Sequence, residues 1–590
     1  MKHLFILATV LLTTLTANAQ TELTSAQAKT SYKTITKTRI SIHDPSVVFN
    51  PKNNRYYIFG SHKAGAYTAD MMNWAQANPR WKVGSSNNAD NKIAFVTPAV
   101  KKVKKGGVEV DFPAFNAMDW AGRTDASYNI DGNMWAPDVI WNPTMNKWCM
   151  YLSINGDQWH SSIILLTADN ITGPYLYQGP IVISGFDNGD HTFKDTDLEL
   201  VLGTLNSLPS RYNGTWATTG KPSLPNNIDP CVFYDEEGKL WIAYGSWSGG
   251  IFMLELDEET GLRDYDVTYT TSDGDPYFGK RIAGGYYVSG EGPYIEHIGN
   301  YYYLFMSYGF FSPDGGYEMR VFRSTKPDGP YKDASNRSAI FSSYVMNYGT
   351  GSSDTRGTKL MGAYNLWGEQ TVGECAQGHN SIIAAPDGRT YLIYHTKFNN
   401  GTIYHEVRTH QVFVNKDGWL VAAPFEYNGE TITDEQIATT QPFTKEELAG
   451  TYSLLIHKYK MDYQNMEEVT PISITLSTDG KISGDKTGTW SIEEGTGYIK
   501  LTVGGVAYNG VVFEEKMDGV NANVISITAI AKTGVSVWAY NPTLPTTAIK
   551  DIQTSKGLKD AWHTLDGRRL NSEPTTKGLY IRNGKKILVR

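Results

Sequence analysis

Cysteine is scarce in this chain, excess basic charge is absent, and long apolar segments occur only at the N-terminus. The 590 residues include three cysteines, Cys149, Cys231 and Cys375, which is too small and too odd a number for a disulfide framework. Cys149 and Cys231 fall within predicted strands, where we expect small buried side chains. The net charge of -8 leaves no basic footprint for nucleic acid. After residue 19, no run approaches the roughly 18 consecutive apolar residues of a membrane helix, so we expect no membrane span.

Long amphipathic helical patterns are also scarce, whereas the chain has 37 Tyr, 15 Trp and 57 Gly, which favours an all-β protein. The one long apolar run lies at the N-terminus. It follows Lys2 and His3, extends from Leu4 to Leu15, and ends in Ala17-Asn18-Ala19. This pattern is typical of a secretory signal peptide over residues 1–19, so we expect a secreted, periplasmic or cell-surface protein that begins near Gln20.

A short cluster repeated five times organises the chain, and a turn and an aromatic-rich strand follow each copy. The clusters are His43-Asp44-Pro45-Ser46-Val47, Trp135-Ala136-Pro137-Asp138-Val139, Ile228-Asp229-Pro230-Cys231-Val232, Glu291-Gly292-Pro293-Tyr294-Ile295 and His379-Asn380-Ser381-Ile382-Ile383. Their third positions align at residues 45, 137, 230, 293 and 381. Repeats of this kind cannot bury their apolar faces alone, so they must pack side by side or around an axis.

Two of the repeats share a further strand and a similar ending, Gly173-Pro174-Tyr175 and Gly329-Pro330-Tyr331. Five units of three or four strands predict a five-bladed β-propeller over residues 20–440, in which the sheets pack radially around a channel. The innermost strand of each blade runs along that channel. The five clusters would therefore meet at one mouth of it, although they are far apart in the sequence.

Two further segments follow the predicted propeller. Residues 444–450 form a predicted short helical linker after Pro442. Residues 450–541 alternate apolar and polar side chains between Gly-rich turns, which predicts a small antiparallel β-sandwich or barrel. The tail, 547–590, has strand signals of its own, and its Leu565-Asp566-Gly567-Arg568-Arg569 and Lys577-Gly578-Leu579-Tyr580-Ile581 resemble the C-terminal sorting modules of exported Bacteroidetes proteins.

Three of the five clusters carry a carboxylate, namely Asp44, Asp229 and Glu291. Hydrolysis of a glycosidic bond needs one carboxylic acid to protonate the leaving oxygen and a second carboxylate to activate water or attack the sugar. A third carboxylate nearby would raise the pKa of the acid by like-charge repulsion. An isolated Asp-Pro pair is usually a turn former, but here it opens two equivalent strands, which favours a catalytic role.

Taken in order, these motifs resemble glycoside hydrolase family 43, and within it the endo-acting α-1,5-L-arabinanases. The resemblance spans roughly residues 40–420 and rests on His43-Asp44-Pro45-Ser46, residues 133–139, Asn227-Ile228-Asp229-Pro230, residues 245–251, Gly290-Glu291-Gly292-Pro293-Tyr294 and Gly378-His379-Asn380-Ser381. It implies an inverting mechanism with Asp44 as general base, Glu291 as general acid, and Asp229 tuning the pKa of the acid and orienting it. The two catalytic carboxyl groups should then lie about 6.5–9.5 Å apart.

Five more residues are placed by the same motifs. Trp135 would form an aromatic platform beneath a sugar ring and Trp247 is a second candidate, although aromatics on inner strands mostly pack in the core. His43 would hydrogen-bond the substrate or orient Asp44. The resemblance implies that His379 ligates a calcium ion on the propeller axis; because calcium prefers oxygen ligands, chloride and sodium are alternatives. We expect a structural role for Asp138 and no organic cofactor.

Arabinan is thus the expected substrate, cleaved within the chain by a monomeric enzyme. Two other activities remain open on the same fold: an exo-acting α-L-arabinofuranosidase and a β-xylosidase, either of which would have one end of the groove blocked by a loop. A third alternative is a non-catalytic carbohydrate-binding propeller. Three converging carboxylates argue against it, because binding alone does not need them.

Overall fold

A computed structural model describes residues 37–76, 95, 97–122, 133–156, 160–186, 192–213, 224–368, 370, 372–518 and 523–542, and short segments between 562 and 589. The chain divides into two compact units, Met1–Pro542 and Thr543–Arg590. The predicted signal peptide, residues 1–19, lies outside the described residues. Within the described part, no helix is long and apolar enough to cross a membrane.

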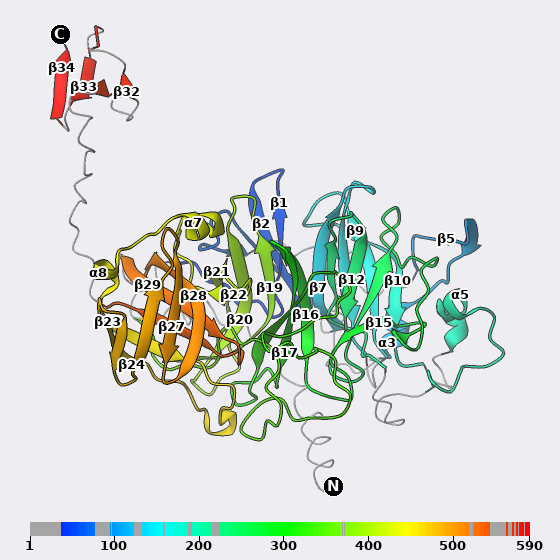
Figure 1. The fold of residues 1–590 in the computed structure, drawn as a ribbon. Helices are drawn as coiled ribbons and strands as arrows, with labels where there is room; N and C mark the ends of the chain where they lie inside the picture. The colour runs from blue at the N-terminus through cyan, green and yellow to red at the C-terminus, as the bar shows by residue number, and fades with distance from the viewer. Residues whose placement is uncertain are drawn as a thin grey trace. The chain divides into compact units, whose positions relative to one another are not determined.

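The first unit consists mainly of antiparallel sheets, as an all-β protein requires (Figure 1). The first sheet contains β1 (Ser46–Asn50), β2 (Arg55–Gly60), β3 (Ala64–Thr68) and β4 (Ala75–Gln76). The second contains β7 (Met134–Asn142), β8 (Lys147–Ile154), β9 (Ser162–Ala168) and β10 (Leu176–Ile183). The third contains β11 (Cys231–Tyr234), β12 (Leu240–Tyr244), β13 (Ile251–Leu256), β14 (Gly274–Asp275) and β15 (Gly279–Ala283).

A seven-stranded sheet follows, with its strands in chain order. It contains β16 (Glu291–Ile298), β17 (Tyr301–Tyr308), β18 (Glu318–Ser324), β19 (Glu374–Ala384), β20 (Thr390–Phe398), β21 (His405–Val414) and β22 (Leu420–Ala422). The connections carry a hairpin of β5 (Lys102–Lys105) and β6 (Val108–Asp111), the short helices α3 (Ala117–Ala121) and α5 (Leu198–Leu202), and the single-turn helices Ser61–Lys63 and Phe193–Asp195. The β18–β19 junction is one parallel pair, Glu318 with Gln377.

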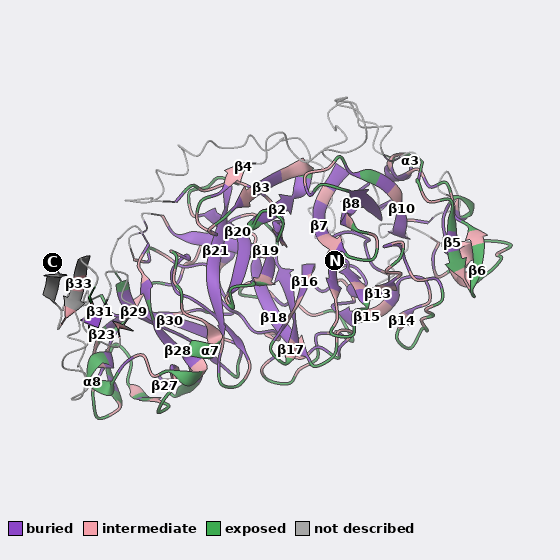
Figure 2. Ribbon diagram, turned by 90° about the horizontal axis from the view of Figure 1, so that it is seen from above, coloured by how far each residue is buried: buried purple, intermediate pink, exposed green. Residues whose placement is uncertain are grey.

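The first strands β1, β7, β11, β16 and β19 contact one another in a closed ring, and the sheets extend outward from it (Figure 2). Hydrogen bonds join neighbours around this ring. One bond for each neighbouring pair runs from Ser46 Oγ to Asp138 Oδ1, from Val232 N to Asp138 Oδ2, from Ile295 N to Cys231 Sγ, from Ala384 N to Glu296 Oε1, and from Ser381 Oγ to the Pro45 carbonyl. Asp138 therefore connects three strands of the ring.

The five clusters adopt one shared backbone conformation where each strand begins. The φ angle is positive at Asp44 (56°), Ala136 (37°), Asp229 (58°), Gly292 (56°) and His379 (42°). Regular pairing with the second strand resumes two residues later in every case, at Ser46, Asp138, Cys231, Tyr294 and Ser381. A left-handed conformation costs a non-Gly residue about 1–2 kcal/mol. Its recurrence at five equivalent positions therefore indicates that the packing of the ring imposes this conformation.

This equivalence corrects the alignment of the fifth cluster by one residue. The sequence alignment took residue 381 as the third position, but His379, two residues earlier, is the structural counterpart of Asp44 and Asp229. His379 also does not begin its strand, because β19 starts at Glu374 and shifts register between Cys375 and Ser381. The extra residues before His379 pair with Lys397 and Phe398, which is why the motif sits inside a strand.

The C-terminal part of the first unit is a closed barrel, which decides between the sandwich and the barrel left open by the sequence. Its strands are β23 (Gly450–Ile456), β24 (Ile472–Leu476), β25 (Lys481–Gly484), β26 (Gly488–Ile492), β27 (Tyr498–Val503), β28 (Val506–Lys516), β29 (Asn523–Ala531) and β30 (Ser536–Tyr540). The helices α7 (Asp434–Thr439) and α8 (Lys445–Leu448) precede it, each with a capping box, and a single helical turn, Tyr463–Asn465, lies within it. Apolar side chains such as Leu454, Trp490 and Val537 form its core.

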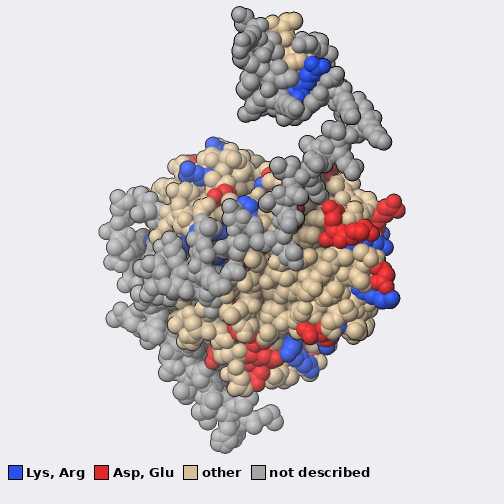
Figure 3. Space-filling model, turned by 90° about the vertical axis from the view of Figure 1, so that its left-hand side faces the viewer, with Lys and Arg blue, Asp and Glu red and all other residues tan. Residues whose placement is uncertain are grey.

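A buried charge network joins the barrel to the ring of sheets. Glu318 on β18 accepts hydrogen bonds from Lys359, from Arg320 and from Tyr463 of the barrel, and all three charged side chains are fully buried. Removing one partner of a buried ion pair strongly destabilises a protein. We therefore expect the contact of Tyr463 with this network to fix the barrel against β18. The described residues on the face in Figure 3 carry acidic and basic side chains in small groups on a mostly uncharged surface.

The second unit, Thr543–Arg590, is a small antiparallel sheet. Its strands are β31 (Trp562–His563), β32 (Arg569–Leu570), β33 (Gly578–Arg582) and β34 (Lys585–Val589), in the order β32-β31-β33-β34. Strands β33 and β34 agree with the strand signals expected in the tail. The role of a sorting module stays a prediction.

Candidate active site

Asp44 lies at the head of β1, where two imidazoles and a hydroxyl hold its carboxylate. Its Oδ1 is 2.7 Å from His43 Nδ1 and 2.9 Å from His379 Nδ1, and its Oδ2 accepts a hydrogen bond from Ser61. Burial opposes the charge of this carboxyl, but His379 and His43 hold its pKa well below the ordinary value. Asp44 is therefore ionised at neutral pH and can accept a proton.

Glu291 opens β16 and is held by three donors. Ser246 Oγ and Trp247 Nε1 donate to its Oε2 at 3.1 and 3.0 Å, and the Tyr317 hydroxyl donates to its Oε1 at 2.9 Å. Burial raises the pKa of Glu291, although His379 and the Tyr317 hydrogen bond act in the opposite direction. A carboxyl with a raised pKa keeps its proton to higher pH, which suits a general acid.

Asp229 is buried at the head of β11, where the charges of both Glu291 and Asp44 act on it. Its pKa is raised to about 7, first by burial and then by the charges of Glu291 and Asp44, although His379 acts in the opposite direction. Its Oδ2 accepts a hydrogen bond from the Gly292 backbone N–H at 3.2 Å, so it fixes the backbone immediately after Glu291. Asp229 is thus tied to the backbone that follows Glu291, and its own pKa responds to the charge of Glu291.

His379 is the cation of this group. Burial works against its charge, but the carboxylates of Asp44, Asp229 and Glu291 raise its pKa to about 9. The ring packs against Gly292, where an added Cβ would lie 3.0 Å from it and the φ is 56°, so both the close contact and the backbone favour glycine opposite His379. The three carboxylates and this histidine come from three different sheets, and the closed ring of first strands brings them together.

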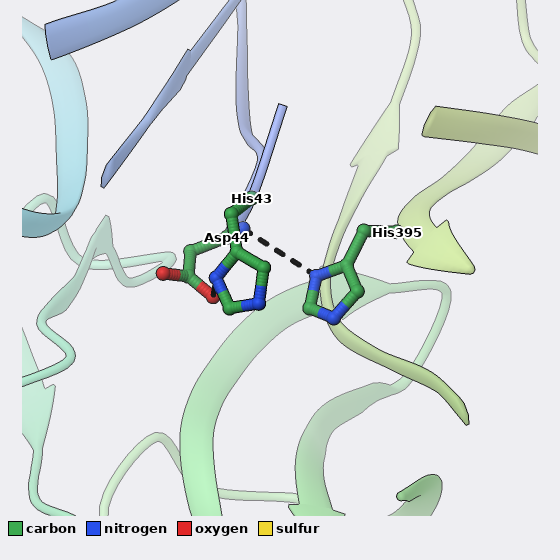
Figure 4. Close-up of side chains that lie close together, drawn as sticks. All are labelled: His43, Asp44 and His395. Carbon is green, nitrogen blue, oxygen red and sulfur yellow. Dashed lines mark hydrogen bonds and ion pairs between the residues drawn. The ribbon is translucent and has the colours of Figure 1, made fainter. Parts of the chain in front are cut away.

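His43 and His395 form a second histidine group beside Asp44 (Figure 4). The His43 and His395 rings stack with their centroids 4.2 Å apart, and the Asp44 N–H points to His395 Nδ1 at 3.5 Å. Burial lowers the pKa of His395 well below its usual value, so this ring is neutral. One metal-ligand atom from each of His43, Asp44 and His395 lies within 4.8 Å of the others, so these residues form a candidate set of ligands that does not include His379.

The two predicted platform residues differ in what surrounds them. Trp247 contacts Glu291 directly, through the hydrogen bond that its Nε1 donates. Trp135 is half-buried near the start of β7, and the N–H of the next residue, Ala136, donates to Ser61 Oγ at 2.9 Å. Because Ser61 also donates to Asp44, the strand that carries Trp135 is tied to Asp44.

Several residues of the site were not predicted from the sequence. Ser61, Tyr317 and His395 lie outside the five clusters, and a single hydroxyl or imidazole in a strand or turn gives no signal of its chemistry. Ser246 is different, because it belongs to the Gly245-Ser246-Trp247 motif that had already been singled out for Trp247.

Replacing Tyr317 tests the hydrogen bond to the acid. We expect Tyr317→Phe to raise the pKa of Glu291, because the hydroxyl stabilises the ionised carboxylate. The alkaline limb of the pH profile of kcat/KM, which falls as Glu291 loses its proton, should then move to higher pH by about 0.5–1 unit. Tyr308→Phe on β17, whose hydroxyl contacts Met306 Sδ, is the matched control and should leave the profile unchanged. A shift of the limb to lower pH would contradict this role.

A ring of sheets that gathers one strongly acidic carboxyl and two carboxyls of raised pKa around a cationic histidine is the site of a glycoside hydrolase. Comparison with known proteins agrees. Residues 203–420 match the family model described as glycosyl hydrolases family 43, and residues 424–539 match a C-terminal lipocalin-like domain that accompanies it.

Two relatives cover most of the chain. The extracellular endo-α-(1→5)-L-arabinanase 2 of Bacillus subtilis is 34% identical over 510 residues, which span 85% of this chain and 92% of that protein. The extracellular endo-α-(1→5)-L-arabinanase of Thermotoga petrophila is 32% identical, over 84% of this chain and 93% of its own length. The crystal structure of endo-1,5-α-L-arabinanase from Thermotoga petrophila superposes with a TM-score of 0.65 and 32% identity, covering 87% of this chain and 99% of that one. The chain belongs to glycoside hydrolase family 43.

Proposed function

We propose that this protein is an inverting endo-α-1,5-L-arabinanase that cleaves within arabinan chains, with Asp44 as general base and Glu291 as general acid. The observation that carries the proposal is the opposite tuning of two carboxyl groups on one ring: the pKa of Asp44 is held well below its usual value and that of Glu291 is raised. Two carboxyls whose pKa values are driven apart are the expected acid and base of a glycosidase. The relatives named endo-arabinanases support the substrate.

The proposed reaction needs no covalent intermediate. Asp44 takes a proton from a water molecule, which attacks the anomeric carbon as the glycosidic bond breaks, and Glu291 gives its proton to the departing oxygen. Asp229 supports the acid through its charge and its hydrogen bond to Gly292 N. His43 and His379 keep Asp44 ionised, and Trp135 and Trp247 are the proposed aromatic contacts for sugar rings.

We further infer that the sheets form a five-bladed propeller. The single parallel pair between β18 and β19 supports counting β16–β18 and β19–β22 as separate blades, beside the sheets headed by β1, β7 and β11. The closed ring of five first strands supports the same count. We also propose that residues 1–19 direct secretion and that the enzyme acts as a monomer.

Product analysis on linear 1,5-α-L-arabinan tests the activity against its alternatives. Endo action should release a ladder of short oligosaccharides early, with arabinose appearing later. An exo-acting arabinofuranosidase would release arabinose from the start, and a β-xylosidase would act on xylo-oligosaccharides instead. Binding to arabinan without hydrolysis would favour the non-catalytic alternative and would contradict the proposal.

We propose a calcium ion near His379, with chloride and sodium as alternative occupants. The donor set suits a cation, because three carboxylates act on His379 through their charges, Asp44 in contact with it, and calcium prefers oxygen ligands. Bound there, the ion would balance the carboxylate charge and order water. A histidine that ligates a metal must be neutral, so binding of the ion would require His379 to lose the proton that makes it a cation. Added calcium should raise Tm after dialysis against a chelator, and an unchanged Tm in the wild type would contradict the site.

A further inference from the structure

Exposed aromatic side chains gather beside the catalytic carboxyls, on the loop that follows β17. Phe310 is 56% exposed and Phe311 is 40% exposed. The Phe310 ring lies 5.2 Å from the Trp247 ring, centroid to centroid, at an interplanar angle of 36°. Tyr348 completes the group edge-on, 6.1 Å from Phe310 and 6.4 Å from Trp247. Exposed apolar rings that cluster beside a polar site are typical of a surface that binds a ligand.

The two phenylalanines lie next to opposite members of the catalytic pair. Phe310 packs on Trp247, whose Nε1 donates to Glu291 Oε2 at 3.0 Å. Phe311 meets the ring of His43 edge-on at 5.5 Å, and His43 Nδ1 is 2.7 Å from Asp44 Oδ1. Phe310 therefore belongs to the side of the acid, and Phe311 to the side of the base.

The loop holds these rings in place. Gly309, at φ 80°, begins it, and a Cβ there would lie 2.3 Å from the Gly316 carbonyl oxygen. The Phe310 N–H donates to the Gly315 carbonyl at 2.9 Å, and the next side chain along, Tyr317, donates to Glu291. One short loop thus fixes the acid and presents Phe310 to solvent, so little conformational entropy is lost when a ligand covers the ring.

Resting on the proposed function, we propose that Phe310, with Trp247 and Tyr348, forms the platform for the arabinofuranosyl residue on the leaving-group side of the cleaved bond. In an inverting reaction the attacked sugar lies between base and acid, and the acid protonates the oxygen of the departing sugar. The departing sugar therefore continues past Glu291, away from Asp44, which is where Phe310 lies. Its apolar C–H face would cover the exposed ring.

This platform also favours cleavage inside a chain. A sugar held beyond the acid belongs to the part of the polymer that departs, so binding energy is gained only when the chain continues past the cleaved bond. That requirement favours substrates bound on both sides of the bond. Phe310 is thus a specificity-determining residue rather than a group that takes part in the chemistry.

Binding measured by calorimetry tests the platform, with linear 1,5-α-L-arabinohexaose as the probe and Glu291→Gln as the background to prevent hydrolysis. Adding Phe310→Ala should weaken binding about tenfold, a loss of about 1.4 kcal/mol, within the range expected for aromatic contacts. Phe310→Tyr keeps the ring and should retain the affinity. Leu176→Ala, which truncates an exposed apolar side chain on β10, is the control and should have no effect.

The outcomes separate the platform from the activity. Unchanged binding by Phe310→Ala, equal weakening by Phe310→Tyr with unchanged Tm, or no binding of the hexaose to the Glu291→Gln protein would each overturn the platform. If the wild type leaves arabinan intact but binding of the hexaose depends on the ring of Phe310, the platform stands and the proposed hydrolysis fails. If the wild type hydrolyses arabinan and Phe310→Ala binds normally, only the platform fails.

Discussion

Glu291→Gln should lower kcat on linear arabinan by about 10²–10⁴-fold, the usual contribution of a positioned general acid. The amide cannot supply a proton to the departing oxygen, yet it keeps the size of the side chain and an oxygen that can accept from Ser246, Trp247 or Tyr317. Substrate binding should therefore survive. The measurement is a steady-state rate together with calorimetric binding of arabinohexaose.

The matched control lies on the same strand. Glu296 on β16 is half-buried, and desolvation raises its pKa to about 7, but it accepts a hydrogen bond from the Ala384 N–H in the ring and not from the donors that hold Glu291. Glu296→Gln keeps that acceptor, so kcat should stay close to the wild-type value. Unchanged turnover in Glu291→Gln, or equal losses in both variants, would refute the assignment of Glu291.

Asp44→Gly should abolish hydrolysis to a similar degree, about 10²–10⁴-fold, because no group remains to take the proton of the attacking water. Glycine suits this position, since residue 44 has a φ of 56° and glycine adopts positive φ without steric cost. The loss should therefore come from the missing carboxylate and not from a strained backbone. Rates on a 4-nitrophenyl α-1,5-L-arabinotrioside, with Tm as the folding check, measure it.

Azide supplies a chemical control for the base. The space left by the Asp44 side chain can admit this small anion, which attacks the anomeric carbon without needing deprotonation while nitrophenol departs. Activity should return with azide in Asp44→Gly and yield a glycosyl azide of inverted configuration. Azide should not rescue a variant at Glu291 in this way. An azide product of retained configuration would contradict the role of Asp44 as the base.

The all-β class could be predicted from the sequence, and so could the meeting of Asp44, Asp229 and Glu291 on one ring, because clusters that begin equivalent strands indicate where their side chains come together. The catalytic roles of the three residues stay predictions. The sequence alignment placed His379 one position away from its structural counterparts Asp44 and Asp229. The reason is the register shift in β19, where additional residues pair with β20 before the motif. A bulge of this kind depends on the partner strand, so the local sequence of one strand does not reveal it.

Other features depend on contacts between residues far apart in the chain. The barrel closes because β23 pairs with β30, as Leu454 does with Ala539, and alternation within each strand is the same in a sandwich and a barrel. Likewise, Tyr317 joins the site only because its place next to β18 brings its hydroxyl to Glu291. Ser61 joins it because a helical turn brings its hydroxyl to Asp44. Phe310 gave no signal, since exposure is a property of the folded chain.

A proton NMR time course of the first products from linear 1,5-α-L-arabinan tests the assigned pair most directly. If Asp44 activates water while Glu291 protonates the leaving oxygen, the new reducing ends should appear first as the β anomer and then mutarotate. Initial appearance of the α anomer would mean retention of configuration, which would contradict the roles given to Asp44 and Glu291.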